Sequence, residues 1–309
     1  MNKYLPYIVA AFVFIVAFIS CSESTVKHED NRITMTTTIN GEIVICIIGT
    51  GWTTIDWGDG ESERTLLIDP PDLGFIYEYE FSHTYTTANT KTITITANNK
   101  VTGLATDRSG VVAALDVTAC PSLKYLNCNY EHLTSLNLSK NAALVKLKCI
   151  GNRLTGLDIS KNTALEELMC YDNQLTILDL SKNTELIELG CQNNQLTSLS
   201  VNKSPMLKYL YCQGNRLTSL NVSKCTVLES LHCNDNQLSS LDISENIVLR
   251  NLYCQDNNLN AGALNTLFND LPDRTGKTMG GIDVRNNSGV TQAGYNPTIA
   301  TAKNWSVID

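Results

Sequence analysis

The sequence has few of the residues and none of the short motifs that build common catalytic and metal sites. It contains only four histidines, and no serine-hydrolase, zinc-protease, redox dithiol or phosphate-loop motif occurs in its 309 residues. Basic residues are also in deficit, since the formal net charge is −8, which argues against a nucleic-acid partner. Seven prolines and a hydrophobic share of 43% exclude a proline-rich or disordered chain. We therefore expect no enzyme, no cofactor and no metal site.

Long hydrophobic runs are absent except at the N-terminus. An apolar stretch from Leu5 to Ile19 follows Lys3, and it is short for a membrane span, which indicates a signal peptide. The segment Phe18-Ile19-Ser20-Cys21 resembles a bacterial lipobox. This resemblance implies a signal peptide over 1–20, lipidation of Cys21, a tether over 21–32, and a location in the bacterial envelope, anchored to the outer membrane and surface-exposed. The alternative is an ordinary cleaved signal with an incidental cysteine.

Residues 33–100 alternate apolar and polar side chains, which predicts β-strands. The segments Ile55-Asp-Trp-Gly-Asp-Gly60 and Phe81-Ser-His-Thr-Tyr85 resemble polycystic-kidney-disease (PKD) domains, and this implies an immunoglobulin-like β-sandwich. Asp56, Asp59 and His83 could suggest a metal site. We expect instead that the aspartates stabilise tight turns and that His83 forms a hydrogen bond within the sandwich.

A 21-residue repeat dominates the rest of the chain. Cysteine recurs seven times from Cys128 to Cys254, and leucine recurs in the same register from Leu123 to Leu249. A weaker copy covers 102–122 and joins the sandwich directly to the repeats. The pattern predicts a leucine-rich-repeat solenoid over 101–260 with leucines inside, because one coil cannot bury its own apolar face. The asparagine that recurs from Asn152 to Asn257 should bond backbone groups at the turns.

The cysteine column raises the question of disulfides in a secreted protein. Neighbouring side chains in a parallel ladder point the same way, whereas a disulfide needs a roughly perpendicular torsion. An odd column of seven also cannot pair completely, so we predict free, buried thiols. The redox states of Cys46, Cys120 and Cys225 stay open at this stage.

The cysteine ladder resembles that of cysteine-ladder internalins, and the phrase Leu175-Thr-Ile-Leu-Asp-Leu-Ser-Lys-Asn-Thr184 resembles leucine-rich surface lipoproteins of gut commensal bacteria. The resemblance implies a binding role without naming a ligand.

After Asn257, helical spacing at Leu264, Leu267 and Phe268 predicts a C-terminal α/β cap over 261–309. The expected fold is thus mainly β: a sandwich, a solenoid with a parallel sheet on its concave face, and a cap.

Side chains that flank the strand leucines should face the concave side, because side chains alternate across a strand. Tyrosines gather there over the last coils, and tyrosine is enriched at binding hot spots. Glu167 and Glu188 are neighbouring acids on this face, but Lys146 beside them indicates a salt bridge and not a glycosidase pair. We expect an extracellular protein or polysaccharide to bind here; a spacer protein without a ligand is the alternative. The candidate residues are Tyr125, Lys148, Met169, Tyr171, Tyr209, Tyr211, His232 and Tyr253.

Overall fold

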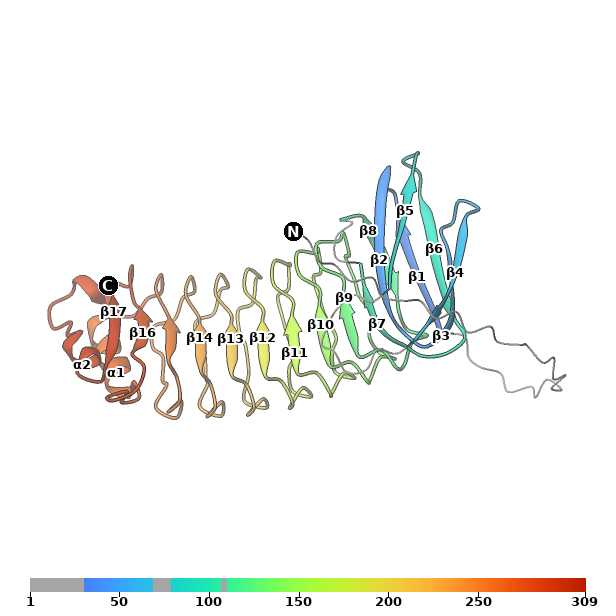
Figure 1. Ribbon diagram of the computed structural model, residues 1–309. Helices are drawn as coiled ribbons and strands as arrows, with labels where there is room; N and C mark the ends of the chain where they lie inside the picture. Colours follow the sequence, from blue (N-terminus) through green and yellow to red (C-terminus); the bar gives the residue numbers. More distant parts are fainter. Residues whose placement is uncertain (1–30, 69–78, 107–109) are drawn as a thin grey trace, which may run out of the picture.

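The computed structural model describes residues 31–68, 79–106 and 110–309 and has an elongated, mainly β architecture (Figure 1). The expected fold class is confirmed: antiparallel sheets come first, and a parallel β-solenoid and a C-terminal α/β segment follow. The signal peptide and the lipidation of Cys21, both expected from the sequence, lie outside the described residues. Within the described residues no helix has the length and apolar character needed to cross a membrane.

The N-terminal part is built from two sheets. One has the strand order β4-β3-β6-β1-β8, and in the other β5 and β2 continue into β7. The alternation seen in the sequence becomes alternating burial, since Ile33 and Met35 of β1 and Ile43 and Ile45 of β2 are all buried. The strands are β1 (Asn31–Thr37), β2 (Gly41–Gly49), β3 (Gly51–Asp56), β4 (Ser62–Leu67), β5 (Glu80–Tyr85), β6 (Lys91–Ala97), β7 (Val101–Ala105) and β8 (Val112–Asp116).

A polar cluster links the end of β3 to β5 across the two sheets. The Tyr85 hydroxyl donates to the Trp57 carbonyl at 2.6 Å, and the His83 ring stacks on Trp57 with 5.0 Å between centroids. His83 Nε2 lies 2.7 Å from Asp59 Oδ2, while Asp56 Oδ1 accepts the Gly58 N–H at 2.9 Å in a turn where Gly58 has φ +77°. The expectation that these residues stabilise turns and the sandwich is confirmed.

The solenoid strands are three residues long and pair in parallel register at 21-residue intervals. Each central leucine points inward and is buried, as in Leu147 and Leu168, so the leucines of successive coils form one continuous core. The strands are β9 (Tyr125–Asn127), β10 (Lys146–Lys148), β11 (Glu167–Met169), β12 (Glu188–Gly190), β13 (Tyr209–Tyr211), β14 (Ser230–His232) and β15 (Asn251–Tyr253).

Both sheets of the sandwich continue into the first coil of the solenoid. Strand β7 pairs antiparallel with β2 on one side and parallel with β9 on the other, so one sheet of twelve strands runs from β5 to the C-terminal β17. On the opposite side of the coil, β8 pairs antiparallel with β1 and also bridges to the next coil at Asp116 and Asn137. The sandwich therefore shields the first open coil of the solenoid from water, as a terminal cap must.

Two asparagine columns tie neighbouring coils together. In the first column, Asn194 Oδ1 accepts the Leu175 N–H at 2.9 Å, and its Nδ2 donates to the carbonyls of Cys170 and Cys191, both at 3.1 Å. In the second column, Asn183 donates to the carbonyls of Ile159 and Asn162 at 3.3 and 2.9 Å, but its buried Oδ1 has no partner among the described residues. The predicted asparagine ladder is confirmed for the first column.

The ten described cysteines are all buried and form no disulfide, as predicted for the ladder. Burial raises the pKa of the Cys170 thiol to about 12, which keeps it protonated at neutral pH. The positions left open by the sequence, Cys46, Cys120 and Cys225, are also outside any disulfide. In the second column, the Cys225 thiol stands where asparagine usually does and lies 3.6 Å from the Ser204 carbonyl.

The last coil is closed by helices and two further strands. These elements are α1 (Ala261–Asp270), β16 (Gly280–Asp283), a 3₁₀ helix (Ser288–Thr291), α2 (Thr298–Thr301) and β17 (Trp305–Ile308). Helix α1 begins after Asn260, whose side chain accepts the Ala263 N–H. Trp305 is buried, and its indole N–H donates to the Pro272 carbonyl at 2.9 Å. The apolar side of α1, formed by Leu264, Leu267 and Phe268, covers the end of the leucine core.

Candidate ligand-binding face

The outer positions of the three-residue strands form a continuous surface, which we call the strand face. In β9, β10, β11 and β13 the first and third residues are half-buried while the central leucine is fully enclosed. All eight candidate residues belong to this region, because seven occupy outer strand positions and Tyr171 follows β11 by two residues. Seven of the candidates thus lie on one sheet and Tyr171 lies just after it; together they occupy six of the seven coils from β9 to β15, because β12 carries none. Apart from Tyr125 on β9, the candidates fall into three groups on neighbouring strands.

The first group is an ion cluster on β10 and β11. The ammonium groups of Lys146 and Lys148 lie 3.2 and 2.8 Å from the Glu167 carboxylate. Burial opposes the ionisation of Glu167, but its bonds to the two lysines outweigh this and hold its pKa below the usual range. Burial, followed by the charge of Glu167, raises the pKa of Glu188 on the next coil. The expected salt bridge is confirmed, and Lys148 is engaged by it.

The second group, Met169 and Tyr171, lies over Gly190 of β12. Gly190 has no side chain there, and a Cβ atom at this position would lie 2.6 Å from the Met169 sulfur and 3.5 Å from the Tyr171 ring. Met169 and Tyr171 therefore lean over Gly190 from the preceding coil. Burial is the main cause of the raised pKa of Tyr171. The space beside Gly190 is thus occupied by side chains of the protein itself, the Gln192 amide among them at 3.2 Å from that Cβ position.

The third group is a row of rings over β13, β14 and β15, which we call the tyrosine row. Tyr211 packs edge-on against His232 with 4.8 Å between centroids, and His232 lies 4.3 Å from Tyr253. Burial lowers the pKa of His232, which favours the uncharged imidazole. Tyr253 is 37% exposed, and Tyr209 pairs in register with Ser230 beside the row. Tyr125 lies at the other end of the sheet, on β9.

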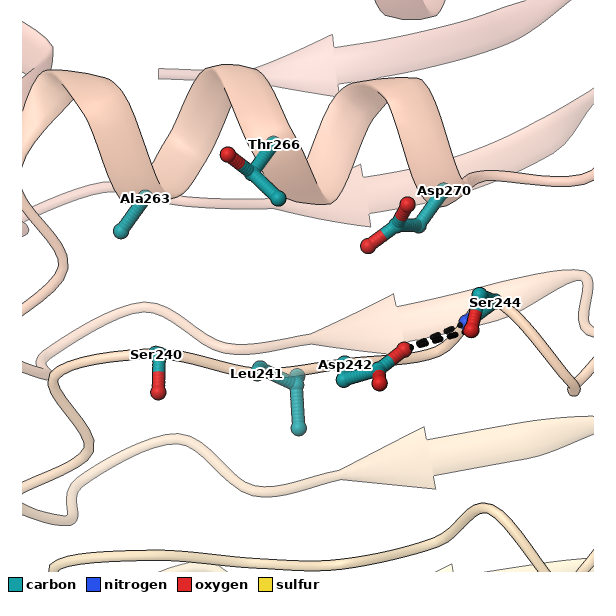
Figure 2. Close-up of a pocket in the computed structure, with 7 residues that line it drawn as sticks. All are labelled: Ser240, Leu241, Asp242, Ser244, Ala263, Thr266 and Asp270. Carbon is teal, nitrogen blue, oxygen red and sulfur yellow. Dashed lines mark hydrogen bonds between the residues drawn. The ribbon is translucent and has the colours of Figure 1, made fainter.

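A pocket lies between α1 and the last complete coil (Figure 2). It measures about 330 Å³, and Thr266 and Asp270 of α1 face Asp242 across it. Hydrogen bonds from Ser244 lower the pKa of Asp242, whereas burial and then the charge of Asp242 raise that of Asp270. No cluster of three or more metal-ligating side chains exists in the part of the chain that the structure describes.

A second pocket was not anticipated from the sequence. It contains Lys208 and Arg250, which directly precede β13 and β15, and Arg274 from the segment between α1 and β16. The column that supplies Lys208 and Arg250 varies in charge and size from coil to coil, so no periodic signal marks it. Arg274 lies outside the repeats altogether, and only the folded cap brings it to this position.

Comparison with known proteins supports the fold. No family model and no curated protein sequence matches the chain. Among solved structures, the functional domain of InlJ from Listeria monocytogenes, which includes a cysteine ladder, is 27% identical with a TM-score of 0.50 and covers 70% of this chain. The chain is a leucine-rich-repeat solenoid similar to InlJ. The match covers 50% of the InlJ structure, so the present chain corresponds to about half of it.

Two further solved structures have lower scores. The leucine-rich-repeat protein LIC12759 from Leptospira interrogans is 21% identical with a TM-score of 0.49, and the match covers 62% of this chain and 56% of that one. The internalin InlF from Listeria monocytogenes is 17% identical with a TM-score of 0.42, and covers 69% of this chain and 90% of that one. The likeness to InlJ includes the feature that distinguishes these repeats, a column of buried cysteines.

Proposed function

We propose that the chain is a non-enzymatic surface lipoprotein that binds a protein ligand through its strand face. The observation that carries the proposal is the tyrosine row, since three ring side chains pack against one another on the strand face and Tyr253 remains exposed. Tyrosine supplies a large apolar contact and a polar tip at low entropic cost, which is why it recurs at binding hot spots. The likeness to a cysteine-ladder internalin domain agrees with a binding role. A polysaccharide is the second ligand class, because rings and neighbouring amides also suit sugars.

The test is a binding screen of the protein against extracellular host proteins and a polysaccharide array. A double variant, Tyr211→Ala with Tyr253→Ala, should lose at least about 30-fold in affinity for the ligand found, which corresponds to ~2 kcal/mol at a hot spot. Ile177→Ala is the matched control, because Ile177 is also an exposed large apolar residue but lies outside the strands. A ligand that binds the double variant as tightly as the wild type would refute the assignment of this face.

A spacer role without a ligand is the alternative function. The continuous twelve-stranded sheet supports it, because such a sheet would hold the C-terminal cap away from the membrane whether or not anything binds. A screen without any ligand would favour this role. Both functions predict lipidation of Cys21. They differ because only the binding function predicts that substitutions in the tyrosine row weaken an interaction.

The proposed organisation assigns 1–20 to a lipoprotein signal peptide, 21–32 to a tether, 33–100 to a PKD-like sandwich, 101–260 to the repeats and 261–309 to the cap. Diacylation of Cys21 would supply two lipid chains, which suffice for stable anchoring where one does not. Metabolic labelling with a radioactive fatty acid tests this assignment. The label should appear in the wild type and be absent from Cys21→Ser, and protease treatment of whole cells should remove the protein if it faces outward.

A further inference from the structure

A pocket of about 430 Å³ lies at the edge of the sheet where the last solenoid strands begin. We call it the cationic pocket. It is lined by Lys208, Val227, Glu229, Val248, Arg250 and Arg274.

The backbone holds three of these side chains side by side. The Glu229 N–H donates to the Lys208 carbonyl at 2.9 Å, and the Arg250 N–H donates to the Glu229 carbonyl at 3.0 Å. These bonds extend the ladder of strands β13 to β15 by one residue. The pocket is therefore next to the strand face, and Lys208 directly precedes Tyr209.

The charges in the pocket do not balance. Glu229 forms an ion pair with Arg250, but within the described part of the chain no carboxylate pairs with Lys208 or with Arg274. Arg274 is fixed by two backbone carbonyls, because its Nε donates to Thr278 at 2.8 Å and its Nη1 to Leu249 at 3.3 Å. A guanidinium has five N–H donors, so Arg274 keeps further donors for a ligand while its position is set. Three cations against one anion give a local excess of positive charge in a chain whose net charge is −8.

The remaining walls are aliphatic. Val227 and Val248 line the pocket, and Val248 is 43% exposed. Met206 occupies the same repeat position one coil before Val227 and is 50% exposed. Aliphatic side chains offer an alkyl group a dry contact but give no ring face on which a sugar could stack. The combination of free cations and aliphatic walls thus matches a peptide that carries acidic and aliphatic side chains.

We infer that the cationic pocket takes a carboxylate side chain of an acidic segment in the protein ligand. Lys208 and Arg274 bind the carboxylate, and an aliphatic neighbour of the acidic residue packs on Val227 and Val248. The inference rests on the proposed function and adds the ligand's chemistry, because the same coils carry the tyrosine row.

The test measures binding of the full chain to a random copolymer of glutamate and alanine, with polygalacturonate and neutral dextran as comparison polymers. Wild type should bind the copolymer more tightly than either polysaccharide. Lys208→Ala should weaken binding about fivefold, as expected for loss of one partly exposed charge pair, and Lys208→Glu should weaken it further. Lys182→Ala is the matched control, because Lys182 is an exposed lysine in a solenoid turn. Raising the salt concentration from about 0.05 M to about 0.5 M should weaken binding in wild type.

Three results would overturn the inference. They are the absence of copolymer binding, equal affinity in wild type and Lys208→Ala, and tighter binding of polygalacturonate, which would point to a sugar acid. The Tyr211→Ala/Tyr253→Ala variant separates the two proposals. If the tyrosine double variant binds both the copolymer and the screened ligand as the wild type does, while Lys208→Ala loses affinity for the copolymer, the proposal for the tyrosine row is wrong and the cationic pocket stands. If Lys208→Ala binds both as the wild type does, while the double variant loses the screened ligand, the cationic pocket is wrong and the tyrosine row stands.

Discussion

We expect an Asn→Ala substitution to lower the free energy of unfolding by different amounts in the two asparagine columns. Asn194→Ala removes the one acceptor that the Leu175 N–H has among the described residues. The carbonyls that Asn194 also contacts keep other donors, because Asn173 still bonds Cys170 and Asn215 still bonds Cys191. One buried N–H is therefore left unsatisfied, which costs ~1–3 kcal/mol in addition to the lost volume.

Asn183→Ala leaves neither of the carbonyls that Asn183 bonds without a hydrogen-bond donor. The Ile159 carbonyl keeps the Asn162 N–H at 3.0 Å, and the Asn162 carbonyl keeps the Leu165 N–H at 3.2 Å. The substitution also removes the buried Oδ1 of Asn183, which has no partner in the described structure. Since the volume lost is the same in both variants, we expect Asn194→Ala to lower the free energy of unfolding by ~1–3 kcal/mol more than Asn183→Ala does.

Urea denaturation followed by far-UV circular dichroism measures this difference. Native-state hydrogen exchange gives an independent readout, because the Leu175 amide should lose protection in Asn194→Ala and keep it in Asn183→Ala. Asn202→Ala is the control, since Asn202 is an exposed asparagine in a solenoid turn. Equal losses in the two column variants would refute the reasoning, because they would mean that side-chain volume and not the orphaned N–H determines the cost.

Two further predictions concern titratable groups. The nine buried cysteines from Cys120 to Cys254 should not react with a thiol reagent at pH 8 until denaturant is added, because burial raises the pKa of each of them, as for Cys170; rapid labelling of any of these nine in the native protein would contradict the enclosed ladder. The hydrogen bond with His83 lowers the pKa of Asp59, so this pair stabilises the sandwich above the unfolded pKa of about 4 and the contribution is lost as pH falls through the lower folded value. Asp59→Asn should make the denaturation midpoint, followed by tryptophan fluorescence, less dependent on pH between about 5 and 2; an unchanged dependence would contradict this role.

The repeats made most of the solenoid predictable. A constant spacing of 21 residues places the buried leucines, the cysteines and the first asparagine column without any other information, because each coil repeats the environment of the one before. The apolar spacing at Leu264, Leu267 and Phe268 likewise indicated the cap helix. The candidate residues of the strand face followed from strand alternation, which is why the structure places seven of the eight on one sheet.

The sequence did not predict the contacts that the repeats make with the sandwich and with the cap. The weak repeat over 102–122 predicted a direct junction, but nothing in the sequence indicated that its strands also pair with the sandwich, β7 with β2 and β8 with β1. The sequence also did not reveal the cationic pocket, because Arg274 reaches it from the cap. The sequence indicated the salt bridge of Lys146, but not that Lys148 binds the same Glu167 carboxylate, because this depends on side-chain direction.

The continuous sheet also determines how the molecule responds to mechanical load. The hydrogen bonds between parallel strands run along the long axis, so tension applied between the sandwich and the cap loads the coil junctions in series, like links of a chain. In such an arrangement the weakest junction sets the rupture force. Ser204 and Cys225 replace the asparagines of the second column in two successive coils, and they substitute a single hydroxyl bond and two weak thiol contacts for paired amide donors. Extension is therefore expected to begin there, close to the tyrosine row.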